Sequence, residues 1–357
     1  PVILNLFMVL GMLLAFYKNF DIGLALSISV VIGGLVQFIL IFFWTKYLKI
    51  SLVYKKPILS KNIKKFFKLL IPNLLAGGVV QINQFVGVIF ASSIPGAISW
   101  LYYADRIVQL PLGVFIISIS TILLTNLSSY NVEGNIIKLK NQIEKSLEIM
   151  IAISLLSCIG LFVLSDLIID ILFKRGQFGY GDVKATSSAI SMYAIGLPAF
   201  GLIKIFSTIF FSRQDTKTPF RISFISMVAN VCLIIIFIEE LGHLGIALAL
   251  SISSWINASI LYTFIYLRGH WKIDISFFKK IIKLSIVFII SLNIMYGIEY
   301  IIIFYDLVST ASLFKKIIFL GYLIIISIST FVLFCIILRL LSIKDLSRKK
   351  LLNLFKE

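Results

Sequence analysis

A short stretch at residues 100–115 carries the side chains best suited to bind an ionic substrate. Asp105, Arg106 and Gln109 lie there inside a long apolar run. On a helix, Tyr102 would share a face with Arg106 and Gln109. A charge near the middle of a lipid-embedded helix costs about 2.5–3.5 kcal/mol, so such a group usually points into a bundle interior or a wet cavity. We interpret Arg106 as a cation in a transport cavity, waiting for an anionic substrate. The alternative is an Asp105–Arg106 pair that only ties helices together.

A second polar helix face is expected in the apolar span 66–93. Asn73, Gly77, Gln81 and Gln84 recur there at helical spacing. Amides in lipid need partners, so this face is expected to turn inward. Two explanations are equally supported: this face makes hydrogen bonds between helices, or it lines the transport cavity.

The span 184–212 combines an intramembrane cation with residues that weaken a helix. Lys204 lies about two turns from the expected cytoplasmic end. Gly196, Pro198 and Gly201 precede it and are candidate hinge residues, because this combination weakens the helical backbone. Lys204 either faces the cavity together with Arg106 or extends its ammonium group to the cytoplasmic surface.

A polar loop follows this span. Thr218 is expected to cap the next helix, with Pro219 at its first position. Asp215 can pair with a neighbouring cation and act as part of a gate, although most such loops are simply tight connections. The candidate gate comprises Arg213, Asp215, Thr216, Lys217 and Pro219.

Composition identifies the broad class of protein. The chain has 357 residues, of which 60% are hydrophobic and 14% charged, and its mean hydropathy is +1.05. A soluble domain has about 45–50% apolar and about 25% charged residues. These values indicate a polytopic membrane protein. The net charge of +17 would suggest nucleic acid in a soluble protein, but the lysines cluster in short loops between apolar runs, so we exclude that partner.

No catalytic constellation is visible in the sequence, so an enzyme is not expected. Asp166 and Asp170 lie at the outer end of an apolar span and are expected to interact with Lys174 and Arg175. A membrane-embedded transferase would need clustered acids for metal or base chemistry. The three cysteines stand far apart in apolar runs and are expected to behave as small hydrophobes. No cofactor or metal is expected.

About ten membrane spans are predicted, since a crossing needs about 20 apolar residues. Of the 33 Lys and Arg residues, 25 fall in one alternate set of connections and six in the other. The positive-inside rule makes the richer side cytoplasmic, and both ends of the chain with it. The predicted spans are 1–17, 22–48, 66–93, 97–129, 145–173, 184–212, 219–240, 243–268, 277–305 and 314–342.

Two basic segments are expected to lie on the membrane surface. In 49–68, apolar residues recur at helical spacing with lysines on the remaining arc, which predicts an amphipathic helix attracted to anionic lipid. This segment is also the predicted boundary between two lobes. The basic tail at 343–357 is expected to bind the same lipids.

Two sequence motifs in the predicted spans and the loop after 184–212 resemble those of a known family. The stretch LYYADRIVQLPLGVF at 101–115 is similar to a signature of the MurJ/MviN lipid II flippases. The stretches GLPAFGLIK at 196–204 and FSRQDTKTP at 211–219 are similar to a second signature of that family. The stretches LFKRGQF at 172–178 and PVILN at 1–5 agree more loosely. One departure is Leu124-Thr125, where the family often has a Leu-Ser pair.

The resemblance implies an all-α exporter fold with two six-helix lobes and two extra C-terminal helices. It assigns 1–48 to the end of the first lobe, 49–65 to a linker helix, 66–268 to the second lobe, 277–342 to the added pair and 343–357 to a cytoplasmic tail. It implies that the first four helices are absent and that the chain begins partway through a longer protein. In the family the added pair borders a groove for a lipid tail.

The resemblance also implies the function. The family moves lipid-linked peptidoglycan precursor, a polyprenyl diphosphate, across the bacterial cytoplasmic membrane by alternating access. Arg106 matches the family's cavity arginine, with Asp105 beside it, and Lys204 matches another recurring position. Three alternatives remain open: an exporter of drugs or of another polyprenyl-linked glycan, a transferase, and an inactive fragment.

Overall fold

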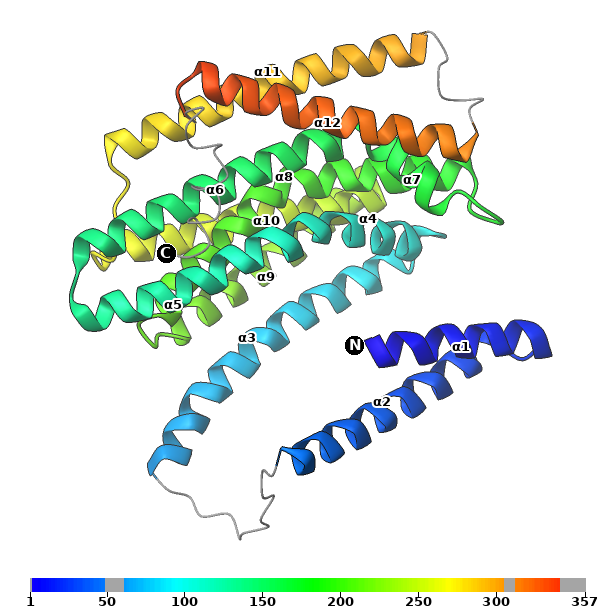
Figure 1. The fold of residues 1–357 in the computed structure, drawn as a ribbon, viewed down its shortest axis with the longest axis horizontal. Helices are drawn as coiled ribbons and strands as arrows, with labels where there is room; N and C mark the ends of the chain where they lie inside the picture. The colour runs from blue at the N-terminus through cyan, green and yellow to red at the C-terminus, as the bar shows by residue number, and fades with distance from the viewer. Residues whose placement is uncertain (1, 49–60, 305–311, 341–357) are drawn as a thin grey trace. The chain divides into compact units, whose positions relative to one another are not determined.

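The computed structural model describes residues 2–48, 61–304 and 312–340, all of them helical or in connections between helices (Figure 1). The helices are α1 (Val2–Lys18), α2 (Ile22–Tyr47), α3 (Lys61–Ala91), α4 (Ala97–Pro111), α5 (Ile117–Glu133), α6 (Ile136–Val163), α7 (Ser165–Phe173), α8 (Tyr180–Phe211), α9 (Lys217–Leu241), α10 (His243–Leu267), α11 (Ile275–Phe304) and α12 (Leu313–Ile337), with a π-helix η1 (Leu112–Ile116) between α4 and α5. The all-α prediction is confirmed.

The chain forms two compact units, and the first, Pro1–Lys64, contains the hairpin of α1 and α2. Asp21 caps α2 by accepting a hydrogen bond from the backbone nitrogen of Leu24 at 2.7 Å. Gly33 of α2 lies against α1, where an added Cβ would come within 3.2 Å of Phe7. Small residues allow helices in lipid to pack closely, so this glycine fixes the hairpin contact.

The second unit, Lys65–Glu357, is built around α8. This helix packs against α4, α5, α6, α7, α9 and α10. Its fully buried side chains include Leu197, Ile205 and Phe210. The helices α11 and α12 pack on the α6 side of this bundle (Figure 1). Gly242, with φ of +56°, ends α9 where the chain reverses into α10, a backbone conformation that favours glycine.

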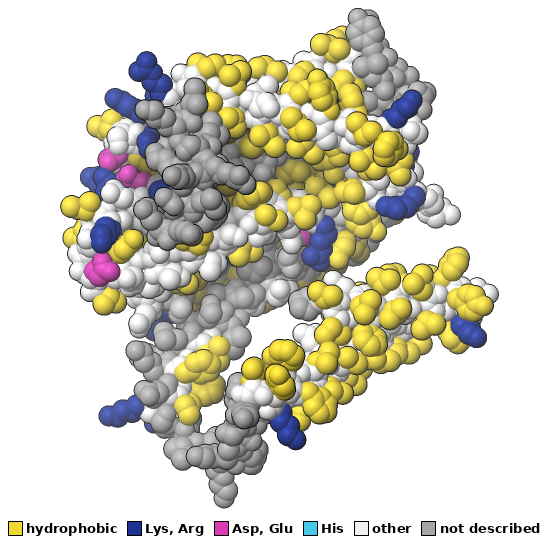
Figure 2. All heavy atoms as spheres, viewed as in Figure 1, with side chains coloured by type: hydrophobic (Ala, Val, Ile, Leu, Met, Phe, Trp, Pro, Cys, Tyr) yellow, Lys and Arg dark blue, Asp and Glu magenta, His cyan; other side chains and the backbone are white. Residues whose placement is uncertain are grey.

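Eight helical segments in the described part of the chain are long and apolar enough to cross a membrane. They correspond to eight of the ten predicted spans, and α4, η1 and α5 together form one continuous apolar segment, Ala97–Glu133. The predicted spans 1–17 and 66–93 fall on α1 and α3, which contain the shorter apolar stretches Val2–Lys18 and Gln81–Ala91. Figure 2 shows hydrophobic side chains over most of the visible helix surfaces, as expected for a protein in lipid.

One predicted span needs correction, and two predicted segments lie wholly or largely outside the described residues. The predicted span 145–173 is two helices, because α6 begins at Ile136 and ends at Val163 and the short α7 follows. Because α6 begins nine residues before the predicted span and is 28 residues long, it ends at Val163. The acidic residues at 166 and 170 therefore lie in the separate helix α7. The predicted linker helix 49–65 lies outside the described residues up to residue 60, and residues 61–65 are the first turns of α3. The tail 343–357 also lies outside the described residues.

Candidate functional site

The helix α4 positions the acidic residue of the candidate site. Asp105 accepts a hydrogen bond from Nε2 of Gln109, one turn further along the same helix. Both side chains are partly buried. No salt bridge joins Asp105 to Arg106 in the described residues, although the Arg106 charge acts on the neighbouring carboxylate. The Asp105 carboxylate is instead satisfied by an amide. The alternative of a purely structural pair stays open.

Arg106 is held by Tyr102 on the exposed side of α4. Its Nη2 atom donates a hydrogen bond to the Tyr102 hydroxyl at 3.0 Å. The guanidinium carbon also lies 4.7 Å from the centre of the Tyr102 ring, within the range of a cation–π contact. Both side chains are exposed. A tyrosine orients the guanidinium without neutralising it, so the positive charge stays available to an anionic ligand.

A backbone irregularity follows directly after this polar face. Pro111 ends α4, and the π-helix η1 connects it to α5. Proline has no N–H and crowds the carbonyl four residues earlier, which disturbs the regular hydrogen-bond pattern. Single π-helical turns inside α-helices occur frequently at functional sites. The sequence showed the proline but gave no signal for the π-helical turn.

The predicted polar face of α3 divides into two parts. Gln81 and Gln84 are exposed, whereas Asn83 connects to the neighbouring helices. Its Oδ1 accepts a hydrogen bond from Asn230 Nδ2 of α9 at 2.7 Å, and Asn230 Oδ1 accepts one from Ser253 Oγ of α10 at 3.4 Å. This network across three helices was missed, because helical periodicity places Asn83 off the polar line and identifies no partner for it.

Lys204 of α8 has an exposed side chain, and its ammonium makes no ion pair with a described residue. Its backbone carbonyl accepts a hydrogen bond from Thr208 Oγ1 at 2.8 Å. The described contacts do not bring Lys204 to Arg106, so a cavity shared by the two cations stays a prediction.

The candidate hinge lies inside a continuous helix. α8 runs without interruption through Gly196, Pro198 and Gly201, all three of which are buried. A Cβ on Gly196 would lie 2.9 Å from the Cα of Ser251 in α10. A Cβ on Gly201 would lie 2.4 Å from the sulfur of Met150 in α6. The two glycines therefore allow close helix packing here, and their role as a hinge stays a prediction.

The loop between α8 and α9 has a different capping arrangement from the predicted one. The helix starts at Lys217, so neither Thr218 as its cap nor Pro219 as its first residue is correct. Asp215 supplies the capping oxygen, because its Oδ1 accepts a hydrogen bond from the backbone nitrogen of Thr218 at 3.0 Å. A carboxylate fits this position better than a threonine, since it accepts from exposed backbone donors and complements the helix dipole.

Asp215 also pairs with a residue distant in sequence. Its Oδ2 lies 2.5 Å from Nη1 of Arg268 at the end of α10, rather than against Arg213 or Lys217 as the sequence suggested. Arg213 instead donates from Nη1 to the Ile209 carbonyl at 3.1 Å. Burial would raise the pKa of Asp215, but the hydrogen bonds from Thr218 and the Arg268 charge outweigh it and hold that pKa below its usual value.

Potential metal ligands do not cluster in the described part of the chain, where no group of three or more His, Cys, Asp or Glu side chains could hold an ion. Cys158 and Cys335 are buried as free thiols, and the Cys158 thiol donates to the Ala194 carbonyl at 3.1 Å. The candidate site on α4 therefore offers charged and hydrogen-bonding groups to a ligand.

Comparison with known sequences identifies close relatives. The family model for lipid II flippase MurJ matches residues 1–319. The probable lipid II flippase MurJ of Rhizobium meliloti (strain 1021) is 36% identical over 289 residues, which cover 80% of this chain and 54% of that protein. The probable lipid II flippase MurJ of Vibrio cholerae serotype O1 is 36% identical over 276 residues, which cover 75% of this chain and 51% of that protein. The chain spans about half the length of the curated relatives it matches.

Comparison with solved structures agrees. A lipid II flippase MurJ in an inward closed conformation matches with a TM-score of 0.73 and 28% identity, over 95% of this chain and 66% of that one. A multidrug resistance MATE family transporter of the MOP superfamily, in an inward-facing conformation, matches with a TM-score of 0.60 and 17% identity. The match covers 71% of this chain and 59% of that one. The second likeness concerns the fold alone. On the family match and the identity to its relatives, this membrane protein belongs to the lipid II flippase MurJ family.

Proposed function

We propose that this protein takes part in moving lipid II, the lipid-linked precursor of peptidoglycan, from the inner to the outer leaflet of the bacterial cytoplasmic membrane. The relatives that it matches are named as lipid II flippases. The substrate would be recognised by its diphosphate, a compact anion, while its polyprenyl tail stays in lipid. This division suits a bundle that carries a cation on a largely apolar helix.

The observation that supports this proposal most directly is the environment of Arg106. Its guanidinium is oriented by the Tyr102 hydroxyl and ring, and Asp105 is occupied by Gln109. Arginine presents several N–H donors in a planar fork, which matches phosphate oxygens with short charge-assisted hydrogen bonds. In a site with little water such bonds are stronger than at a surface. Arg106 would therefore bind the diphosphate, with Gln109 as a neighbouring polar group.

Alternating access needs parts of the bundle that can change their arrangement. The π-helical turn after Pro111 is one such position, because its hydrogen-bond pattern is already irregular. The residues Gly196, Pro198 and Gly201 in α8 are a second, and the Asp215 loop is a candidate gate at one end. Lys204, Gln81 and Gln84 would contribute further polar groups to the pathway.

The proposed orientation places both ends of the chain in the cytoplasm. The connections rich in Lys and Arg, which include those after α5, α8 and α10, lie at one end of the second unit (Figure 1). Basic residues concentrate on the cytoplasmic side of membrane proteins. The same residues would attract anionic lipids, each contributing about 1 kcal/mol near the surface.

The test is flipping in cells whose own lipid II flippase can be depleted, with the gene for this protein supplied in full. We expect Arg106→Ala to abolish flipping, measured as lipid II accessible from outside, without loss of protein from the membrane. Arg106→Lys should restore little, because the forked geometry is lost. The matched control Arg221→Ala, a cation at the loop end of α9, should flip normally. Normal flipping by Arg106→Ala would refute the assignment.

The main alternative is export of cationic drugs on the same fold. A drug exporter should bind small cations better than lipid II, whereas the cationic Arg106 site should favour the diphosphate. Binding of both ligands to the purified protein, compared between wild type and Arg106→Ala, separates these two functions.

A further inference from the structure

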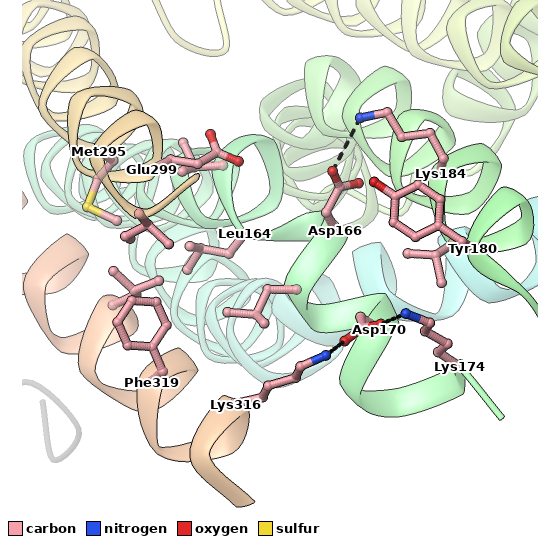
Figure 3. A pocket seen from close by; sticks show the side chains of 15 residues that line it. Leu164, Asp166, Asp170, Lys174, Tyr180, Lys184, Met295, Glu299, Lys316 and Phe319 are labelled. Atoms are coloured by element: carbon pink, nitrogen blue, oxygen red, sulfur yellow. Dashed lines mark hydrogen bonds and ion pairs between the residues drawn. The ribbon is translucent and has the colours of Figure 1, made fainter. Parts of the chain in front are cut away.

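A cavity of about 430 Å³ lies away from the Arg106 site and is lined by residues of α6, α7, α8, α11 and α12. Figure 3 shows six charged residues around it, drawn from α7, α8, α11, α12 and the turn after α7. They lie within a few turns of their helix ends, at the end of the unit with fewer basic residues. This cavity is therefore expected at the depth of lipid headgroups rather than in the middle of the bilayer.

One end of the cavity carries a net positive charge. Asp170 of α7 lies 2.7 Å from Lys316 and 2.9 Å from Lys174, so two ammonium groups share one carboxylate. Figure 3 shows the two lysines reaching Asp170 from opposite sides. The side chains of Lys316 and Asp170 are only 14% and 16% exposed. The two lysines hold the pKa of Asp170 below its usual value although burial opposes this, so the carboxylate stays charged and the trio has one excess positive charge.

The other end carries a net negative charge. Asp166 lies one turn before Asp170 on α7 and pairs with Lys184 of α8 at 3.3 Å. Glu299 of α11 lines the same end and lies within electrostatic range of both. It is partly buried and makes no ion pair with a described residue. Two carboxylates thus share one ammonium group, and that group is exposed.

One wall of the cavity is apolar. Met295 of α11 and Phe319 of α12 line it (Figure 3), together with Leu323 of α12. Met295 and Leu323 are buried. A ligand that fills this cavity should therefore have an apolar part beside a headgroup with separated charges. Residues four apart on a helix have Cβ atoms about 5–6 Å from each other, so the two charged ends are a short distance apart.

We propose that this cavity binds a zwitterionic phospholipid with a primary ammonium group, that is, an ethanolamine phospholipid. Its phosphate lies at the Lys316 and Lys174 end, and its ammonium donates hydrogen bonds to Glu299 and Asp166. An acyl chain lies along the wall formed by Met295, Phe319 and Leu323. The bound lipid supplies the counter-charge that each end lacks and ties α11 and α12 to the bundle. This site is separate from Arg106 and does not depend on the proposed transport.

Native mass spectrometry of the purified protein with defined lipids tests the proposal. Wild-type protein should retain phosphatidylethanolamine about tenfold better than phosphatidylglycerol, a difference of about 1.4 kcal/mol. Glu299→Gln should remove most of that preference and leave the fold intact, because Glu299 makes no ion pair with a described residue that the substitution would break. Glu240→Gln, an exposed acid at the end of α9, is the matched control and should bind as wild type does.

A second pair of variants tests the positive end. Lys316→Ala should weaken retention of both lipids, whereas the neighbouring Lys315→Ala should not, because Lys315 does not line the cavity. Glu299→Lys should reverse the preference in favour of phosphatidylglycerol, since the negative end becomes positive. Soluble glycerophosphoethanolamine, which lacks acyl chains, should not displace the lipid.

Three results would overturn the proposal. They are equal retention of the two lipids by wild-type protein, an unchanged preference in Glu299→Gln, and displacement by the soluble headgroup at concentrations similar to the lipid's own. None of these results bears on whether Arg106 supports flipping.

Discussion

Arg268, at the end of α10, places its Nη1 atom 2.5 Å from Oδ2 of Asp215, in the loop between α8 and α9. Its Nη2 atom donates to Oγ1 of Thr218 at 2.9 Å. One guanidinium therefore connects the end of α10 to both the capping residue and the first turn of α9. The loop matching a family signature is thus fixed by a residue more than 50 positions away.

Removing this connection should have a modest effect on stability. The side chains of Arg268 and Asp215 are 41% and 25% exposed, so their coupling in a double-mutant cycle of Asp215→Asn and Arg268→Gln should be about 0.5–1 kcal/mol. Asp215→Ala should cost about 1 kcal/mol more, because the cap is lost as well. Thermal unfolding in detergent measures these changes. Arg221→Gln serves as control, and zero coupling would contradict the contact.

His270 should make the protein less stable in mild acid. Burial, helped by the charges of Arg213 and Arg268, lowers the pKa of its imidazole below the unfolded value of about 6.5. Because the unfolded chain then binds the proton more readily, stability should be full above about pH 6.5 and should fall as the pH drops towards the folded pKa. His270→Asn should remove this part of the pH dependence of the melting temperature. A wild-type melting temperature that stays level from pH 7 to 5 would contradict it.

At still lower pH, the stability of the folded protein should depend on Asp215. Its pKa is lowered in the folded protein, so its contribution is present above the unfolded value of about 3.9 and is lost as the pH falls through the folded value. The melting temperatures of wild type and Asp215→Asn should therefore begin to converge only as the pH falls below about 4. Curves that stay equally far apart at all pH values would show that the carboxylate's charge does not matter.

The glycines of α8 should differ in their tolerance of a methyl group. Gly196→Ala would bring Cβ within 2.9 Å of the Ser251 backbone, whereas Gly201→Ala would meet the flexible side chain of Met150 first. Overpacking costs about 1–3 kcal/mol, so Gly196→Ala should fall at the upper end and Gly201→Ala lower. Gly160→Ala in α6, with nothing within 4 Å of the new Cβ, is the control. Equal unfolding temperatures for all three would contradict this order.

The Asn83–Asn230–Ser253 network should hold α3, α9 and α10 together. Asn230 is 2% exposed. Asn230→Leu would remove the hydrogen bonds that Asn83 and Ser253 make with it. Hydrogen bonds between membrane helices contribute about 0.6 kcal/mol on average and up to about 1.7, and we expect a loss of about 1 kcal/mol. Asn293→Leu is the control, since among the described residues Asn293 donates to the Ile289 carbonyl of its own helix and to no other helix. A larger loss for the control would contradict the network's role.

The amino-acid sequence determined the class of fold and most of the spans. Apolar runs of sufficient length can cross lipid only as helices, because every backbone polar group must find a partner within its own segment. The same logic singled out Arg106, since a charge inside such a run needs a reason to be there. The pairing of Lys174 with Asp170 was also predictable, because residues four apart on a helix are neighbours.

Only the tertiary structure decided which partner each polar group finds. Asp215 binds Arg268 instead of Arg213 or Lys217, and Asp105 binds Gln109 instead of Arg106. Helical periodicity gives the direction in which a side chain points, but it gives neither the neighbouring helix nor the distance to it. The cavity around Glu299 is the clearest case, because its charged ends come from helices separated by more than a hundred residues and meet only through packing.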